Sequence, residues 1–117
     1  RVLATNPDMI CPVEDGEIID AGATIAALEA LLGRPIDGVI GKPSPIMIEY
    51  VVSRMGCDPA ACLMVGDRLE TDIAMGKAAG MAAALVLTGV TDRETVARSQ
   101  IQPDFILSSI ADLRPDT

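Results

Sequence analysis

Two aspartates follow a short apolar run in the stretch LMVGDRLETDI, residues 63–73. Asp67 comes directly after Gly66, which lets backbone approach closely, and Asp72 stands five positions later at the start of the next expected helix. Two carboxylates this near each other repel unless a cation joins them or one takes up a proton. With oxygen ligands and no histidine in the chain, the cation that we expect is Mg²⁺. An aspartate at a helix start can also act only as a cap, so both roles stay open for Asp72.

Lys42 is the third residue whose position suits chemistry. It follows the apolar run GVIG and precedes a helix that we expect to begin near Pro45. Backbone N–H groups and the helix dipole favour an anion at such a point, and a lysine adds a charge suited to phosphate. A solvated surface lysine is the alternative. Together with Asp67 after a neighbouring strand, Lys42 indicates a site for phosphate plus magnesium.

From residue 36 onward, predicted strands and helices alternate. The strands are DGVIGK, CLMVGD, MAAALVLTG and PDFILSS, and the helices are SPIMIEYVVSRMG, TDIAMGKAAG (with Thr71 as candidate N-cap), TDRETVARSQ and SIADL. This order predicts an α/β fold, a Rossmann-like parallel sheet with helices on both faces. Ligands of such sheets bind at the carboxyl ends of the strands, where Lys42 and Asp67 stand.

Residues 1–35 have a different pattern. A strand VLAT leads into the irregular stretch NPDMICPVEDGEIIDAG, and a helix ATIAALEALLG follows, which Gly33 ends. We therefore expect a boundary at residues 33–37, with residues 36–117 forming the parallel-sheet part.

Composition excludes several classes of protein. A net charge of −8 and a single tyrosine and phenylalanine argue against nucleic acid as a partner. No apolar run approaches the roughly 20 residues of a membrane span, and the first residues are not typical of a signal peptide. Cys11, Cys57 and Cys62 have no CxxC spacing, and without histidine neither a zinc site nor a histidine-activated nucleophile is expected. Reduced thiols in a cytoplasmic protein are the simplest interpretation.

The blocks IGKPSPIMIE, LMVGDRLETDIAMGKAAGM and LVLTGVT resemble the third and fourth motifs of the haloacid-dehalogenase-like (HAD) phosphohydrolases. They are similar to the subclass that contains para-nitrophenyl phosphatase, phosphoglycolate phosphatase and pyridoxal phosphate phosphatase. The stretch ATNPDMICPVEDGEIIDAGATIAALEALLGR resembles the last part of that subclass's α/β cap domain, and QPDFILSSIADL its C-terminal strand and helix. The resemblance implies a cap remnant at residues 1–35 and the C-terminal half of the HAD-like core at residues 36–117.

The resemblance also implies roles for residues. It makes Asp67 a direct Mg²⁺ ligand, Asp72 a support of the metal shell through water, and Lys42 a bridge between the substrate phosphoryl group and the nucleophile. Asn6 and Asp8 belong to a cap segment that faces the active site, so contact with the leaving group is expected of them, although Asn-Pro-Asp is also ordinary turn chemistry. The implied activity is hydrolysis of a small phosphorylated metabolite through an aspartyl-phosphate.

The chain departs from the family at the nucleophile. The family's first motif is an Asp-x-Asp that supplies the nucleophile and the general acid/base, and no Asp-x-Asp occurs in these 117 residues. We therefore expect the nucleophile upstream of Arg1, on a missing N-terminal half, and no turnover by this chain alone. Thr5 in VLATN could imitate the family's second motif, a Thr or Ser at the end of a strand, although its neighbours fit the cap better. An unpaired sheet edge would also favour self-association into a homo-oligomer.

Three other functions are weighed against a phosphatase fragment. The first is a non-catalytic binding or interaction module that keeps the fold remnant, and an upstream Asp-x-Asp-Gly in the same reading frame would argue against it. The second is a phosphoacceptor receiver-like domain, which needs an acidic pair near its start and does not match a lysine at 42 ahead of Asp67. A dinucleotide-binding domain fits least, because no GxGxxG follows any strand.

Overall fold

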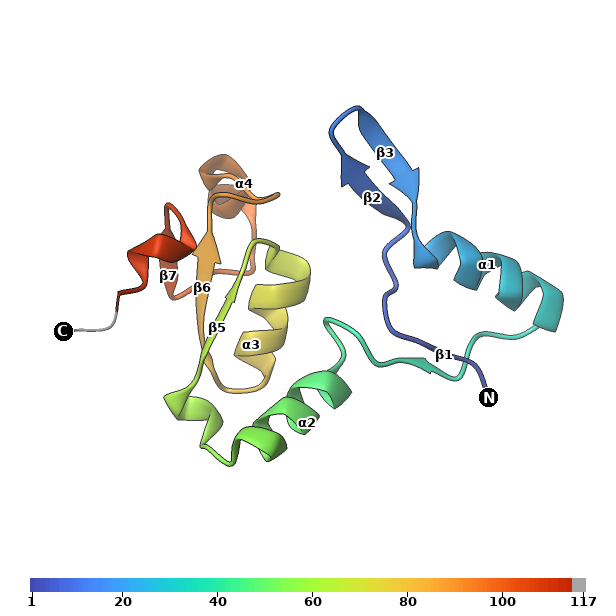
Figure 1. The fold of residues 1–117 in the computed structure, drawn as a ribbon, viewed down its shortest axis with the longest axis horizontal. Coiled ribbons are helices and arrows are strands. Elements are labelled where there is room, and N and C mark those ends of the chain that lie inside the picture. Colours follow the sequence, from blue (N-terminus) through green and yellow to red (C-terminus); the bar gives the residue numbers. More distant parts are fainter. Residues whose placement is uncertain (115–117) are drawn as a thin grey trace. The chain divides into compact units, whose positions relative to one another are not determined.

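The computed structural model describes residues 1–114 (Figure 1). The chain divides into two compact units, one formed by Arg1–Met47 and a second that begins at Ile48. The break between the units falls within the first turn of a helix, ten residues beyond the stretch 33–37 where the sequence predicts a boundary. The division into a cap remnant, residues 1–35, and a core, residues 36–117, stays a prediction.

Unit 1 contains a pair of parallel strands, a hairpin and a helix (Figure 1). Strand β1 (Leu3–Ala4) pairs in parallel with β4 (Gly38–Val39), and β2 (Ile10–Val13) pairs antiparallel with β3 (Gly16–Ile19). Helix α1 (Ala21–Leu32) follows the hairpin and ends at Gly33, whose φ of 65° lies in the left-handed region, as the sequence predicts.

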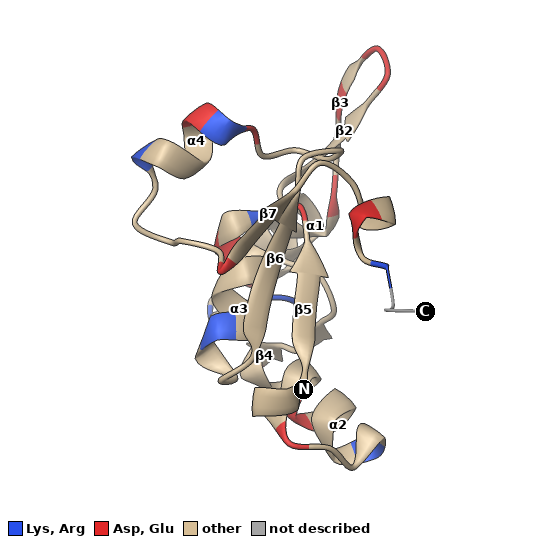
Figure 2. Cartoon of the chain, turned by 90° about the vertical axis from the view of Figure 1, so that its left-hand side faces the viewer, with Lys and Arg blue, Asp and Glu red and all other residues tan. Residues whose placement is uncertain are grey.

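The β2–β3 hairpin lies in the stretch of unit 1 that the sequence predicts to be irregular. Pro12 lacks a backbone N–H and argues against a central strand, but it is tolerated here because β2 pairs on one side, with β3, in a two-stranded sheet. Gly16 has a φ of 139° that an L-residue rarely adopts, and it closes the turn after Asp15. Acidic residues colour the tip of this hairpin in Figure 2.

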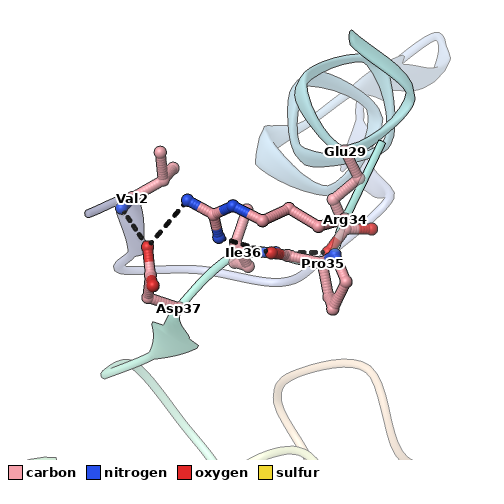
Figure 3. A network of polar contacts seen from close by, with 6 residues as sticks. All are labelled: Val2, Glu29, Arg34, Pro35, Ile36 and Asp37. Carbon is pink, nitrogen blue, oxygen red and sulfur yellow. Dashed lines mark hydrogen bonds and ion pairs between the residues drawn. The ribbon is translucent and has the colours of Figure 1, made fainter. Parts of the chain in front are cut away.

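A polar network joins the end of α1 to the strand pair (Figure 3). The Asp37 carboxylate accepts the backbone N–H of Val2 at 2.6 Å and lies 3.5 Å from the Arg34 guanidinium. The Glu29 side chain accepts the N–H of Ile36 at 2.9 Å. The hydrogen bond from Val2, followed by the charge of Arg34, lowers the pKa of Asp37 against the opposing effect of burial. These contacts hold the register in which β1 and β4 run side by side.

Unit 2 is a three-stranded parallel sheet with helices. The strand order is β5 (Leu63–Gly66), β6 (Ala82–Val86) and β7 (Phe105–Leu107), with β6 in the centre. The helices are α2 (Pro45–Met55, whose first residues belong to unit 1), α3 (Ala74–Ala78) and α4 (Arg93–Arg98), and single turns lie at Pro59–Ala61 and Ile110–Asp112. The parallel α/β fold class is thereby confirmed. No helix in the described part of the chain is both long enough and apolar enough to cross a membrane.

The core of unit 2 lies against the central strand. Ala83 and Leu85 of β6 pack with Leu69, Ile73 and Val96, and none of the five side chains is more than 3% exposed. Figure 2 shows that the three strands carry no charged residue, and the central strand β6 is the most buried of them. Gly76 lets α3 approach closely, because a Cβ there would overlap Met64 of β5.

The segment after β5 differs from the prediction. The sequence predicts a helix with Thr71 as its N-cap, but Leu69–Ile73 forms a π-helical turn that leads into α3. The Arg68 carbonyl accepts the N–H groups of both Asp72, at 3.0 Å, and Ile73, at 3.2 Å. Thr71 is therefore inside the turn, and its hydroxyl oxygen is buried without a hydrogen-bond partner among the described residues. A π-helical turn of this kind is frequent at functional sites.

An ion pair between Lys77 and Asp104 gives a test of the packing of α3 against the sheet. The Lys77 ammonium donates to one Asp104 oxygen at 2.6 Å, and the N–H of Ala83 donates to the other at 2.8 Å. Both contacts, Lys77 first, lower the pKa of Asp104 below its ordinary value of 3.8. Because the folded-state pKa is the lower one, the stabilisation is complete above the ordinary value and is lost as pH falls through the folded value.

We therefore expect Asp104→Asn to lower the urea midpoint of unfolding at about pH 7 and to have a much smaller effect at about pH 2. Glu94→Gln breaks a more exposed ion pair, the 3.5 Å contact with Arg98, and should change the midpoint little at either pH. An equal effect of Asp104→Asn at both pH values would contradict a stabilising role for the ionised Asp104 carboxylate.

Candidate functional site

Asp67 follows β5 directly, and its carboxylate lies at the carboxyl end of the sheet. Its Oδ2 atom accepts the backbone N–H of Val90 at 2.9 Å, in the loop that follows the neighbouring strand β6. Because β5 and β6 are parallel, both loops emerge at the same edge, where ligands of open α/β sheets bind. The predicted position of Asp67 is therefore observed, and Val90 is the contact that orients its side chain.

Asp72 is buried, with 3% of its surface exposed, and it holds the loop that carries Asp67. Its Oδ2 atom lies 3.2 Å from the backbone nitrogens of both Asp67 and Arg68, and both N–H groups donate to it. A carboxylate that accepts two backbone N–H groups is a strong local clamp, since hydrogen bonds to a charged group are stronger than neutral ones. Asp72 thus fixes the direction in which the chain leaves β5.

Two glycines make room for these carboxylates. A Cβ on Gly66 would overlap the Asp72 side chain, and a Cβ on Gly89 would overlap the side chain of Asp67. Any larger residue at either position would push one of the two aspartates away from its backbone donors. The sequence singles out Gly66 but not Gly89, although Gly89 lies in the block LVLTGVT that supports the family resemblance.

The two carboxylates fit a Mg²⁺ site that takes few ligands from the protein. Asp67 supplies carboxylate oxygen at an open strand end, and Asp72 lies behind it as a buried second carboxylate. Within residues 1–114, no three acidic or cysteine side chains gather into a group that could hold a metal ion. Mg²⁺ commonly binds one or two protein carboxylates and completes its shell with water and substrate phosphate oxygens, so the pair suits a site of that kind.

Lys42 belongs to unit 1, where it follows the end of β4. The backbone of Gly41 lies so close to β1 that a Cβ there would overlap the Thr5 carbonyl, and the N–H of Ile40 donates to Ala4 at 2.8 Å. Lys42 and Asn6 therefore leave the same end of the parallel β1–β4 pair. Asp67 and Asp72 lie in unit 2, and the phosphate role of Lys42 stays a prediction.

Asn6 and Asp8 take part in a turn that holds α1. The Asn6 amide donates to Asp20 at 2.9 Å and accepts the backbone N–H of Asp8 at 2.9 Å, while Asp20 accepts the N–H of Ala21 at the helix start, at 2.6 Å. Gly22 lets this turn approach, since a Cβ there would meet the Pro7 carbonyl at 2.6 Å. The Asn-Pro-Asp segment thus performs ordinary turn chemistry, and its predicted contact with a leaving group stays a prediction.

A parallel α/β sheet with an anchored carboxylate at the carboxyl end of a strand defines a Rossmann-like domain with a candidate cation site. Comparison with known proteins gives the family. Residues 39–113 match the Hydrolase_like family, described as HAD-hydrolase-like. The chain therefore belongs to the HAD-like hydrolase family, and the resemblance found in the sequence is confirmed.

Three relatives illustrate the similarity. Sugar-phosphatase AraL of Bacillus subtilis is 42% identical over 113 residues, which are 97% of this chain and 41% of that protein. A p-nitrophenyl phosphatase structure from Archaeoglobus fulgidus is 42% identical with a TM-score of 0.84, over 94% of this chain and 44% of that one. A glycerol phosphate phosphatase structure from Mycobacterium tuberculosis, in complex with magnesium, is 34% identical with a TM-score of 0.83, over 97% and 35% of the two chains. The chain spans about two-fifths of the length of such relatives.

The clamp made by Asp72 can be tested against a matched carboxylate. Asp112 also accepts two consecutive backbone N–H groups on one oxygen, from Ser108 at 2.7 Å and Ser109 at 3.1 Å, but it is exposed. We expect Asp72→Ala to cost about 1–3 kcal/mol of unfolding free energy, because it leaves two N–H groups without an acceptor in a buried place. Asp112→Ala should cost clearly less, since water replaces its carboxylate. Urea unfolding measures both values, and equal costs would argue against the clamp.

Proposed function

We propose that this chain is the C-terminal part of a Mg²⁺-dependent phosphatase that hydrolyses a small phosphorylated metabolite through an aspartyl-phosphate. The observation that carries the proposal is the Asp67 carboxylate at the end of β5, oriented by the N–H of Val90 and accommodated by Gly89. Membership in the HAD-like hydrolase family and relatives named as sugar, nitrophenyl and glycerol phosphate phosphatases support the reaction class. These relatives are named for different phosphate substrates, so the proposal names the class of substrate.

In this proposal each site residue has a separate task. Asp67 would hold Mg²⁺ directly, and Asp72 would keep Asp67 in position and support the metal shell. When bound, Mg²⁺ would withdraw negative charge from the phosphoryl oxygens during transfer. Lys42 would supply a second positive charge to the same group, a role suited to an ammonium because it is compact and has three donors. Asn6 and Asp8, at the start of unit 1, would lie on the side of the leaving group.

The covalent step needs a group that this chain lacks. The family's nucleophile and general acid/base are aspartates of an Asp-x-Asp, which is absent from the sequence. A general acid/base alone contributes about 10²–10⁴-fold to rate, so losing it together with the nucleophile should remove turnover. We therefore infer that an N-terminal segment of the same protein completes the site.

Unit 2 has a surface suited to such a segment. Strand β5 is an edge of the three-stranded sheet, and Leu63 on this strand is 39% exposed. Helix α2 also exposes Tyr50, Val51 and Met55, at 65%, 39% and 62%. An added strand would pair with β5 and cover apolar surface of this kind. Self-association of the chain is the other way to cover it.

The activity prediction is that the 117-residue chain does not hydrolyse p-nitrophenyl phosphate in Mg²⁺ above the rate of its Asp67→Asn variant. Release of nitrophenolate measures both rates, and EDTA gives the metal-free rate. Activity that disappears in Asp67→Asn would mean that a nucleophile lies within the chain, with Asp8, Asp15 and Asp20 as candidates. Equal rates in both would also fit a non-catalytic binding module, so a second readout is needed.

Metal binding supplies that readout without turnover. We expect Mn²⁺, added as a paramagnetic substitute for Mg²⁺, to broaden the amide NMR signals of Asp67, Arg68, Gly89 and Val90 first. Asp67→Asn should abolish this local broadening, whereas Asp112→Asn, which changes an exposed carboxylate that also accepts backbone N–H groups, should leave it intact. Broadening centred on the acidic tip of the β2–β3 hairpin, and unchanged by Asp67→Asn, would overturn the proposed metal site.

A further inference from the structure

Two cysteines that are five positions apart lie side by side in unit 2. The Sγ atoms of Cys57 and Cys62 are 3.2 Å apart and share a hydrogen bond in which either thiol could donate. Both side chains are partly exposed, and both thiols are free. Neither residue belongs to the metal and phosphate site proposed above. The spacing does not match CxxC, so the sequence gives no signal of this contact.

The backbone around the pair is held by several independent constraints. Gly56 ends α2 with a φ of 64°, and its N–H donates to Val52 at 3.0 Å. Asp58 caps the following turn, η1 (Pro59–Ala61): its side chain accepts the N–H of Ala60 and its carbonyl accepts the N–H of Ala61, both at 2.9 Å.

The second cysteine is tied to the same turn. The N–H of Cys62 donates to the Pro59 carbonyl at 2.9 Å, and the Cys62 thiol also lies 3.4 Å from the Asp58 carbonyl. The ring of Pro59 fixes its φ, so the turn has little freedom to open. The fold therefore keeps the two sulfurs together, and an S–S bond of about 2.05 Å requires an approach of only about 1 Å.

We propose that Cys57 and Cys62 form a dithiol site that exchanges with small-molecule disulfides to give an intramolecular disulfide. One thiolate attacks a disulfide RSSR, which forms a mixed disulfide and releases RS⁻. The other thiolate then attacks the protein sulfur of that mixed disulfide and releases the second RS⁻. Two S–H bonds are lost, one S–S bond forms in the protein, and RSSR is reduced to two RSH that take up the two protons.

The charge state of the pair sets the conditions for exchange. The hydrogen bond with Cys57 is the largest cause that raises the pKa of Cys62, and burial and the charges of Cys57 and Asp58 act in the same direction. Because the thiolate is the attacking species, attack by Cys62 should be slow at neutral pH and faster in mildly alkaline buffer.

The disulfide would change a specific connection in the fold. Cys57 follows α2, and Cys62 directly precedes β5, the strand that leads to Asp67. An S–S bond would therefore fix the link between that helix and the start of that strand. Cys11, the remaining cysteine, lies in β2 of unit 1 and should stay a free thiol.

The test is equilibration of the 117-residue chain in buffers of reduced and oxidised glutathione at about pH 8.5, with the same titration in urea. Acid quenching, alkylation and peptide mass mapping should give a product about 2 Da lighter, linked between Cys57 and Cys62, with Cys11 alkylated. We expect the folded chain to favour the disulfide by about tenfold or more over the unfolded chain, because the sulfurs are already adjacent. Equal equilibria in the two states, or linkage through Cys11, would overturn the proposal.

Variants separate the geometry of the turn from general stability. Cys57→Ser and Cys62→Ser should each give a glutathione adduct on the remaining thiol in place of the internal bond. Asp58→Ala removes the cap of the turn and should move the folded equilibrium toward the unfolded value. Asp92→Ala is the matched control, because it removes an equivalent cap, the 2.8 Å bond from Thr95, at α4. An equal shift with both alanine variants would contradict the role of the turn.

Discussion

The candidate site depends on the two hydrogen bonds that the buried Asp72 carboxylate accepts. It accepts the backbone N–H groups of Asp67 and Arg68 directly after the end of β5. A charge in a buried place is favourable only when such donors surround it, and the donors in turn are costly to leave without an acceptor. Gly66 makes the contact sterically feasible, and the π-helical turn brings Asp72 back toward the end of the strand. The loop after β5, the π-helical turn and the orientation of Asp67 therefore depend on one another.

Packing in the core of unit 2 also fixes the position of Asp72. The side chains of Leu69 and Ile73, from the π-helical turn, are fully buried against Ala83 and Leu85 of β6. The same short segment thus carries core residues and the buried aspartate, so the position of Asp72 is fixed by packing as well as by hydrogen bonds. On the opposite strand end, Cys57 and Cys62 mark where the chain enters β5. Strand β5 therefore lies between two constrained segments, the capped turn that precedes it and the loop that follows it.

Much of the fold follows from local sequence. The apolar runs at β5 and β6, the glycine at the end of α1, and the alternation of strands with helices are all readable, because each depends on neighbours within a few residues. The sequence does not reveal the β2–β3 hairpin, because Pro12 argues against a strand unless the pairing partner is known. The sequence does not reveal the π-helical turn either. Thr71 precedes a helical pattern, as an N-cap would, and only the Arg68 carbonyl, which accepts two N–H groups, shows the extra residue in the turn.

The sequence by itself determined the family, the parallel α/β class, and the residue types that could bind phosphate and magnesium, since motif spacing along one strand and its loop is a local property. Only the tertiary structure decided what each group touches. The N–H that orients Asp67 comes from Val90, 23 positions away, and the glycine that makes room for it lies beside that residue. The amide of Asn6 reaches Asp20 across 14 positions, and the thiols of Cys57 and Cys62 meet because a capped turn bends the chain between them. Such contacts depend on how separate elements pack, and the spacing of residues along the chain does not encode that packing directly.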